Sequence, residues 1–157
     1  MRIIVFSDSH NNISRMEKVL NTIIGVDAVI HCGDGKSDLD EVAINHPDIK
    51  FYGVRGNCDG VPAESEIVVN LGDKKIFMTH GHRYSVKSEI EVDYPTIRER
   101  GRELEVDAVV FGHTHIPYNH HWGDVVVMNP GSIKYSGTYG VIEIEEGKMK
   151  TATLNLF

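Results

Sequence analysis

Short apolar runs alternate with amphipathic segments over the first third of the chain. Apolar runs of four to six residues are typical of buried strands, and apolar residues at helical spacing are typical of helices that cover a sheet. The strands are expected at residues 2–7, 27–31 and 49–54, and the helices at about 12–25 and from Ser37 to before Pro47. The order strand, helix, strand, helix, strand predicts a parallel α/β half.

Two short sequence signals give the expected starts of these helices. Asn11-Asn12 offers an N-cap for the first helix, because asparagine side chains accept hydrogen bonds from the free backbone N–H groups of a first turn. Ser37 with Asp40 resembles a capping box and predicts the start of the second helix.

The pattern of the remaining chain predicts antiparallel pairing and one further helix. Gly72-Asp73 between two apolar strands is a hairpin signal, and Pro95 suits the first turn of a helix. The strands are expected at residues 65–71, 75–80, 107–111, 117–122, 124–128, 138–145 and 148–156, with a helix at about 95–105. No internal repeat or linker is visible, so a single α/β domain over residues 1–157 is expected.

Composition and charge narrow the function classes. The hydrophobic share of 41% and charged share of 25% are ordinary for a globular protein and exclude collagen-like, coiled-coil and disordered chains. The net charge of −7 argues against long nucleic acid or an anionic membrane as partner. Two cysteines form no disulfide framework, and no apolar run is long enough for a signal peptide or a membrane span. We therefore expect a cytoplasmic protein with reduced thiols.

Nine histidines are the unusual feature of the composition, and several adjoin glycine. Five expected strands each end in a loop that carries aspartate, asparagine or histidine beside glycine. The candidate metal ligands in these loops are Asp8, His10, Asp34, Asn57, His80, His113 and His115. Ligands in open α/β sheets bind beyond the carboxyl ends of the strands, so these loops are expected to meet at one edge.

The seven candidates combine oxygen and nitrogen donors. Such mixed sets suit Mn, Fe, Zn, Ni or Co better than Mg or Ca alone, and seven ligands suit two adjacent ions. Two divalent ions with two carboxylates leave a local charge of about +2, which lets an acidic protein hold a phosphate ester. The sequence thus predicts two divalent metal ions, Mn first, with Ni, Zn, Fe, Co and Mg open.

The motifs Asp8-x-His10, Gly33-Asp34, Gly56-Asn57, His80-Gly81-His82 and Gly112-His113-Thr114-His115 resemble the five blocks of the calcineurin-like metallophosphoesterase superfamily. The resemblance covers the whole chain, and the small size and the segment Asn129-Pro130-Gly131-Ser132 are similar to the compact, YfcE-like phosphodiesterase branch. It implies an α/β fold in which a two-sheet β sandwich is flanked by helices in four αββα layers.

The resemblance also implies the roles of the site residues. One ion would be held by Asp8, His10 and His115, the other by Asn57, His80 and His113, and Asp34 would bridge them. A metal-bridging hydroxide would hydrolyse phosphodiester bonds, with phosphomonoesters open as further substrates. A small phosphate ester is the expected substrate of this hydrolase.

One position departs from the family pattern. Many members carry a histidine directly after the motif asparagine, whereas this chain has Cys58 there. A thiol is a weaker hydrogen-bond donor than imidazolium and carries no positive charge, so esters with poor leaving groups are expected to react slowly. Asn57, His82 and Asp59 are the catalytic candidates, with His82 the candidate proton donor because it lies two residues from His80.

Several residues allow a second interpretation. Cys58 is favoured as a buried or site-lining thiol over a nucleophile, and His31 is read equally as a support for a ligand or as a structural histidine. His120-His121-Trp122 is favoured as a solvated turn or strand edge over a metal tract. Arg55 fits a phosphate contact or an ion pair.

Two whole-protein alternatives also stand beside the hydrolase. The resemblance includes a retromer-type scaffold that uses the same fold for protein contacts, and fold alone does not establish activity. A nuclease for long nucleic acid is the weaker alternative. A homodimer or higher homo-oligomer is left open.

Overall fold

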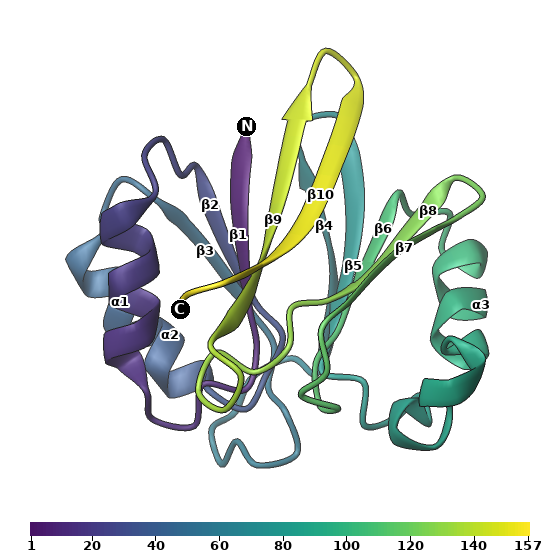
Figure 1. Ribbon diagram of the computed structural model, residues 1–157, viewed down its shortest axis with the longest axis horizontal. Coiled ribbons are helices and arrows are strands. Elements are labelled where there is room, and N and C mark those ends of the chain that lie inside the picture. Colours follow the sequence, from purple (N-terminus) through teal and green to yellow (C-terminus); the bar gives the residue numbers. More distant parts are fainter.

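The computed structural model describes residues 1–157 and contains two five-stranded mixed sheets packed face to face (Figure 1). The first sheet has the order β10-β9-β1-β2-β3, and the second has the order β4-β5-β6-β8-β7. Helices α1 and α2 cover the first sheet and α3 covers the second. The expected four-layer αββα arrangement is therefore confirmed.

The elements follow the expected order closely. The first sheet contains β1 (Arg2–Phe6), β2 (Ala28–His31), β3 (Lys50–Gly53), β9 (Thr138–Glu145) and β10 (Lys148–Asn155). The second contains β4 (Glu66–Leu71), β5 (Lys74–Thr79), β6 (Ala108–Val110), β7 (Tyr118–Trp122) and β8 (Val125–Asn129). The helices are α1 (Ile13–Thr22), α2 (Lys36–Asn45) and α3 (Pro95–Glu103), and two 3₁₀ turns, Val86–Ser88 and Ile90–Val92, lie in a stretch where the sequence predicted no element.

Strand alternation distributes the apolar side chains among three cores. In β1, Ile3 and Val5 face the second sheet, whereas Ile4 and Phe6 face α1 and α2. Both faces of this strand are thus buried, which explains why it reads as a continuous apolar run. A third cluster lies between the second sheet and α3.

Parallel pairing brings the carboxyl ends of the strands to one edge. In the first sheet β1 pairs in parallel with β2, and β2 with β3. In the second sheet β5 pairs in parallel with β6, and β6 with β8. The loops that follow these strands meet at the lower edge of Figure 1.

The caps of the first two helices differ in origin. The Asn12 side chain accepts a hydrogen bond from Arg15 N at 3.4 Å, which confirms the predicted cap of α1. The predicted capping box at Ser37 is wrong, because α2 begins one residue earlier and its N-cap is Gly35. A carboxylate from another loop, Asp59, accepts the free N–H groups instead.

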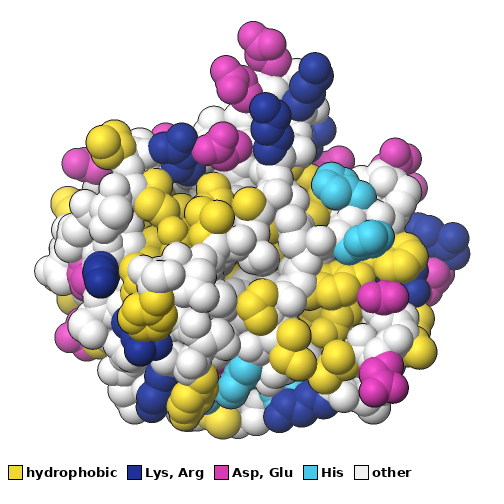
Figure 2. Space-filling view, viewed as in Figure 1, with side chains coloured by type: hydrophobic (Ala, Val, Ile, Leu, Met, Phe, Trp, Pro, Cys, Tyr) yellow, Lys and Arg dark blue, Asp and Glu magenta, His cyan; other side chains and the backbone are white.

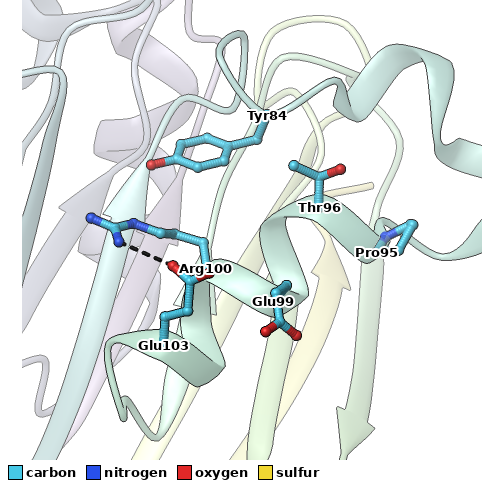
Figure 3. Close-up of a pocket in the computed structure, with 6 residues that line it drawn as sticks. All are labelled: Tyr84, Pro95, Thr96, Glu99, Arg100 and Glu103. Carbon is cyan, nitrogen blue, oxygen red and sulfur yellow. Dashed lines mark hydrogen bonds and ion pairs between the residues drawn. The ribbon is translucent and has the colours of Figure 1, made fainter.

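The second sheet ends in an exposed edge strand. His120 and His121 lie exposed in β7, so the strand-edge interpretation is confirmed. The Arg98 guanidinium packs 3.9 Å from the centroid of Trp122. A hollow of about 450 Å³ beside α3 is lined by Tyr84 and five residues of the helix, among them the ion pair of Arg100 with Glu103 at 3.3 Å (Figure 3). This hollow contains none of the candidate ligands.

The surface carries mixed charge. Figure 2 shows acidic and basic side chains interspersed on the visible face. None of the three helices has the length and apolar character that crossing a membrane requires.

Candidate metal centre

Five of the candidate ligands have backbones in the left-handed region. The φ angles are 53° at Asp8, 39° at His10, 57° at Asp34, 72° at His113 and 63° at His115. Non-glycine residues rarely adopt such angles, and the cost of each persists only where the surrounding structure enforces it. Their concentration in loops that meet at one edge indicates a functional site.

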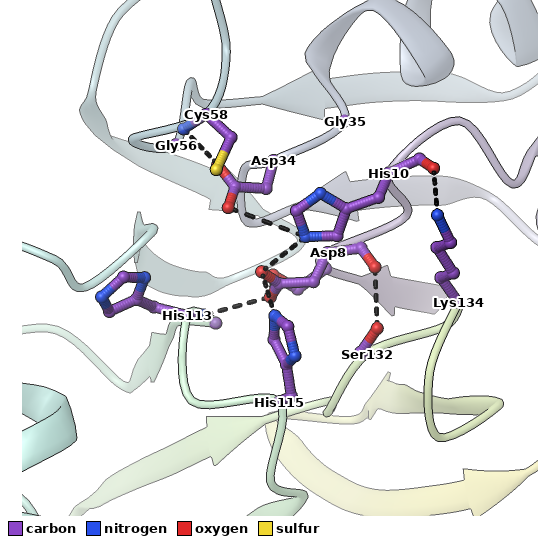
Figure 4. Close-up of polar contacts among 12 residues, drawn as sticks. Asp8, His10, Asp34, Gly35, Gly56, Cys58, His113, His115, Ser132 and Lys134 are labelled. Carbon is purple, nitrogen blue, oxygen red and sulfur yellow. Dashed lines mark hydrogen bonds and ion pairs between the residues drawn. The ribbon is translucent and has the colours of Figure 1, made fainter.

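Asp8 lies fully buried at the end of β1, and its two oxygens have different surroundings. Oδ2 accepts hydrogen bonds from Ser7 Oγ at 2.6 Å and from the backbone N–H of His113 at 3.0 Å. Oδ1 lies 3.1 Å from His115 Nε2 and 3.6 Å from His10 Nε2 (Figure 4). One oxygen therefore orients the carboxylate and the other faces the imidazoles.

Asp34 shows the same division. Oδ1 accepts the backbone N–H of Cys58 at 2.8 Å, whereas Oδ2 lies 3.3 Å from His80 Nε2 and 3.8 Å from His10 Nε2. Burial opposes the charged form, but His80 and the hydrogen bonds from Cys58 outweigh it and hold the pKa of Asp34 well below its usual range. Asp34 is thus an ionised carboxylate that faces both groups of imidazoles.

His80 and His113 come together from the ends of β5 and β6. His80 Nδ1 lies 2.8 Å from the carbonyl oxygen of Cys32, so this nitrogen carries a proton and Nε2 faces the site. His80 Nε2 lies 3.1 Å from His113 Nδ1. Burial opposes protonation of His80, but Asp34 and Asp8 raise its pKa. Burial together with the positive charges of His80 and Lys87 lowers the pKa of His113 to about 4, so its ring is neutral at pH 7, the form that binds metals.

His10 provides a test of whether a cation fits. Its Nε2 is buried and has no hydrogen-bond partner, although it points between the carboxylates of Asp8 and Asp34. A buried polar atom without a partner is costly, and a divalent cation between these groups would satisfy it. The donor atoms of Asp8, His10 and His115 lie within 4.8 Å of one another, and so do those of Asp8, Asp34 and His80. The residues therefore fit divalent ions.

Asn57 does not join this cluster. Its side chain is exposed and donates its one hydrogen bond, of 3.6 Å, to Cys58 Sγ. His82 lies nearer, with its ring centroid 5.6 Å from that of His80 and 6.2 Å from that of His113. The buried Nδ1 of His82 has no partner, and burial with the positive charge of His80 lowers its pKa.

Asp59 has contacts that the sequence did not indicate. Its carboxylate accepts four backbone N–H groups, those of Asp34 at 2.8 Å, Gly35 at 3.0 Å, Lys36 at 3.2 Å and Gly56 at 2.7 Å. It thereby joins two ligand-bearing loops and caps α2. These contacts suit a positioning role, and a part for Asp59 in catalysis stays a prediction.

Cys58 is exposed and lines a cavity of about 200 Å³ that His10 and Asp34 also line. Its Sγ lies within 4.8 Å of donor atoms of both residues. Partial burial and the charge of Asp34 raise the pKa of the thiol, which disfavours the thiolate that a nucleophile needs. The structure thus supports the site-lining interpretation, although the thiol is not buried. Cys32, by contrast, is fully buried.

A buried hydrogen-bond chain supports the first ligand loop. His31 Nδ1 accepts the N–H of Gly33 at 3.1 Å, so Nε2 carries the proton and donates to Ser9 Oγ at 2.9 Å. Ser9 Oγ donates to Asp38 Oδ2 at 2.6 Å. Burial lowers the pKa of His31 to about 4, which fits the neutral ring that this chain requires. Of the two interpretations, the structure favours a support for the ligand loops.

The last residue of β8 and the segment after it also hold the ligand loops in place. Asn129 Nδ2 donates to the carbonyl oxygen of Gly112 and to Thr114 Oγ1, each at 3.0 Å. Ser132 Oγ donates to the carbonyl oxygen of Asp8 at 2.8 Å. These hydrogen bonds therefore fix the backbone of two ligand-bearing loops, the one after β6 and the one after β1.

Comparisons with known proteins agree with this geometry. The family profile described as a calcineurin-like phosphoesterase superfamily domain matches residues 1–147. The chain is 32% identical to the "probable metallophosphoesterase YsnB" of Bacillus subtilis, over 92% of this chain and 85% of that protein. It is 26% identical to "phosphodiesterase YfcE" of Escherichia coli, over 91% of this chain and 88% of that protein.

Solved structures share the fold over almost the whole chain. A Streptococcus pneumoniae protein described as a "predicted phosphoesterase" has a TM-score of 0.79 and 30% identity, with 98% of this chain and 88% of that one covered. Vps29 of Entamoeba histolytica, complexed with zinc, has a TM-score of 0.71 and 19% identity, with 98% of each chain covered. At that identity the second likeness concerns the fold alone.

Proposed function

Because the chain belongs to the calcineurin-like phosphoesterase superfamily, we propose that it hydrolyses phosphodiesters with the help of two divalent metal ions. The observation that carries the proposal is the pair of buried carboxylates, Asp8 and Asp34. Each of them binds the protein through one oxygen and turns the other toward imidazole nitrogens.

The residues divide into two groups around Asp34. Asp8, His10 and His115 would hold one ion, and His80, His113 and Asn57 the other, with Asp34 shared between them. Asn57 would have to turn inward from its exposed position. When bound, the two ions supply a water activated as nucleophile and Lewis acidity toward the phosphate oxygens. Manganese is the first candidate, with nickel, zinc, iron, cobalt and magnesium as alternatives, because affinity and supply both decide occupancy.

The surroundings of Cys58 favour diesters over monoesters. The thiol offers no positive charge to the dianionic phosphate of a monoester, and the pKa of the thiol is raised. His82 is the proposed proton donor, since its ring lies beside those of His80 and His113. A diester with a good leaving group needs this proton least, so such esters are the proposed substrates.

A protein-binding scaffold on the same fold is the alternative. The likeness to Vps29 shows that the fold also occurs in proteins whose names describe no phosphoesterase, but a scaffold has no need of two oriented carboxylates and four converging imidazoles.

The cytoplasmic location, the single-domain organisation and a homo-oligomeric state stay predictions.

Hydrolysis of bis(p-nitrophenyl) phosphate by metal-stripped protein, with and without added Mn²⁺, tests the proposal. We expect activity that needs the metal and is lost in Asp34→Asn. Asp40→Asn is the matched control, since Asp40 is an exposed aspartate of α2 that pairs with Lys36. Folded protein without activity in Mn²⁺, Ni²⁺, Zn²⁺, Co²⁺ or Mg²⁺ would overturn the hydrolase and favour the scaffold.

A further inference from the structure

The exposed ring of Tyr135 lies directly against the proposed metal ligands. Its plane is stacked on that of His115, with centroids 5.3 Å apart and 21° between the planes. The centroid of His10 lies 5.6 Å from that of Tyr135. Tyr135 is nevertheless 61% exposed, so most of an aromatic side chain faces solvent beside the place where a phosphate would bind.

Hydrogen bonds to the site fix the turn that carries this ring. The backbone N–H of Tyr135 donates to Ser132 Oγ at 2.9 Å, and that hydroxyl donates to the carbonyl oxygen of Asp8. Ser136 Oγ donates to the carbonyl oxygen of His115 at 3.1 Å. The ring is therefore held in place before any ligand arrives, which lowers the entropic cost of using it for binding.

Lys134 connects the same turn to the loop of the second ligand, His10. Its Nζ donates to the carbonyl oxygen of His10 at 3.2 Å and lies 5.1 Å from the centroid of Tyr135 (Figure 4 shows the first contact). The ammonium thus ties the tyrosine to the His10 loop and places a positive charge at the rim.

Two exposed apolar residues also follow the histidine on which Tyr135 stacks. Ile116 and Pro117 follow His115 directly, and both are exposed. Pro117 packs against Gly131, where an added Cβ would lie 2.9 Å from Pro117 Cγ at a φ of 75°. Figure 2 shows hydrophobic, histidine and basic side chains adjoining one another along the lower edge, where the site loops lie. We call Tyr135 and Ile116 the aromatic lip.

The side of the site that Cys58 lines has different chemistry. The cavity beside His10 and Asp34 is lined by polar groups that include the carboxylates of Asp38 and Asp59. A planar apolar group gains little there, whereas it can form offset-stacked or edge-to-face contacts with an exposed tyrosine. The two sides therefore discriminate between the groups esterified to a phosphate.

We propose that the aromatic lip binds a planar ring of the substrate, so that the preferred phosphodiesters carry an aryl or nucleobase group. The inference rests on the proposed function, because the metal centre must hold the phosphate while the lip holds the ring. Tyr135 is thereby a specificity-determining residue and contributes no chemistry to the hydrolysis.

Binding of two phosphonates to the Mn²⁺-loaded protein, measured by calorimetry, tests the lip without turnover. Methylphosphonate and phenylphosphonate share the anionic group and differ in the ring. We expect phenylphosphonate to bind about tenfold more tightly, since stacking of a planar ring on an aromatic side chain has that order of effect. Tyr135→Ala should bring the two affinities within about twofold of each other, whereas Tyr135→Phe should preserve the preference.

The controls separate the lip from the metal centre. Ile44→Ala, an exposed apolar residue near the far end of α2, should leave both affinities unchanged. Methylphosphonate should bind all variants equally. Equal affinity of the two phosphonates for the unmodified protein, or a preference that survives in Tyr135→Ala, overturns the lip alone. If neither phosphonate binds, and bis(p-nitrophenyl) phosphate is not hydrolysed, the lip and the proposed function both fail.

Discussion

Replacing Asp59 tests whether its carboxylate holds the site together. Its side chain accepts four backbone N–H groups, at 2.7 to 3.2 Å, from the loop of Asp34, the start of α2 and the loop of Gly56. A hydrogen bond to a charged group contributes about 1.5–3 kcal/mol, and loss of a helix N-cap alone costs about 1 kcal/mol. Asp59 is only partly buried, so water would satisfy some of the freed donors in Asp59→Ala. We therefore expect a loss of about 3 kcal/mol.

The asparagine variant sharpens the estimate. In Asp59→Asn one oxygen still accepts two N–H groups, while the new NH₂ group faces the other two donors. We expect a loss of about half that of Asp59→Ala, or about 1.5 kcal/mol. Urea unfolding with excess chelator measures both free energies without a contribution from bound metal. Asp40→Asn, an exposed aspartate of the same helix, should change stability by less than about 0.5 kcal/mol.

The result also separates positioning from catalysis. A positioning role predicts that Asp59→Asn loses stability and metal affinity together, because Asp34 loses a restraint on its backbone. Unchanged stability in both Asp59 variants, combined with lost hydrolysis, would refute the reasoning and place the carboxylate in the chemistry.

Three other perturbations follow from the same structure. The pKa of His31 falls to about 4 in the fold, so its neutral ring stabilises the protein fully above pH 6.5. That contribution, at most about 3 kcal/mol, should fade between pH 6.5 and 4. The difference in unfolding free energy between the unmodified protein and His31→Gln, followed against pH, should shrink over that window, and a constant difference would contradict it. Gly112→Ala should cost about 2–3 kcal/mol, because the added Cβ would lie 1.9 Å from Ser7 Oγ and 2.7 Å from Asp8 Oδ2; chemical unfolding near that of the unmodified protein would contradict this. Mn²⁺ at about 100 times its dissociation constant should raise the free energy of unfolding of the chelator-treated protein by about 2.7 kcal/mol. A thermal unfolding midpoint that does not change when Mn²⁺ is added would exclude tight binding to the folded protein.

The convergence of the ligands was predictable from sequence because it depends on local pattern and parallel pairing. The run Ile3–Phe6 is a buried strand, and a carboxylate directly after such a strand must lie at the sheet edge. Asp8 and Asp34 could thus be placed together without knowing any contact between them.

Contacts made across loops could not be predicted in the same way. The cap of α2 comes from Asp59, more than twenty residues away from the N–H groups that it accepts, and no local signal links the two. The prediction of a capping box at Ser37 used only the local sequence pattern. It was wrong because the acceptor for the first turn comes from a distant loop. The stacking of Tyr135 on His115 likewise depends on the turn that Ser132 holds against Asp8, which the sequence pattern does not show.

The central claim is that the buried carboxylates and imidazoles hold two divalent ions through a shared Asp34. The direct measurement is the number of ions per chain, determined by elemental analysis of protein equilibrated with Mn²⁺ and freed of excess. We expect two ions per chain in the unmodified protein and in Asp40→Asn, and fewer in Asp34→Asn at matched folding. A chain that retains no ion, or an Asp34→Asn variant that retains two, would contradict the account.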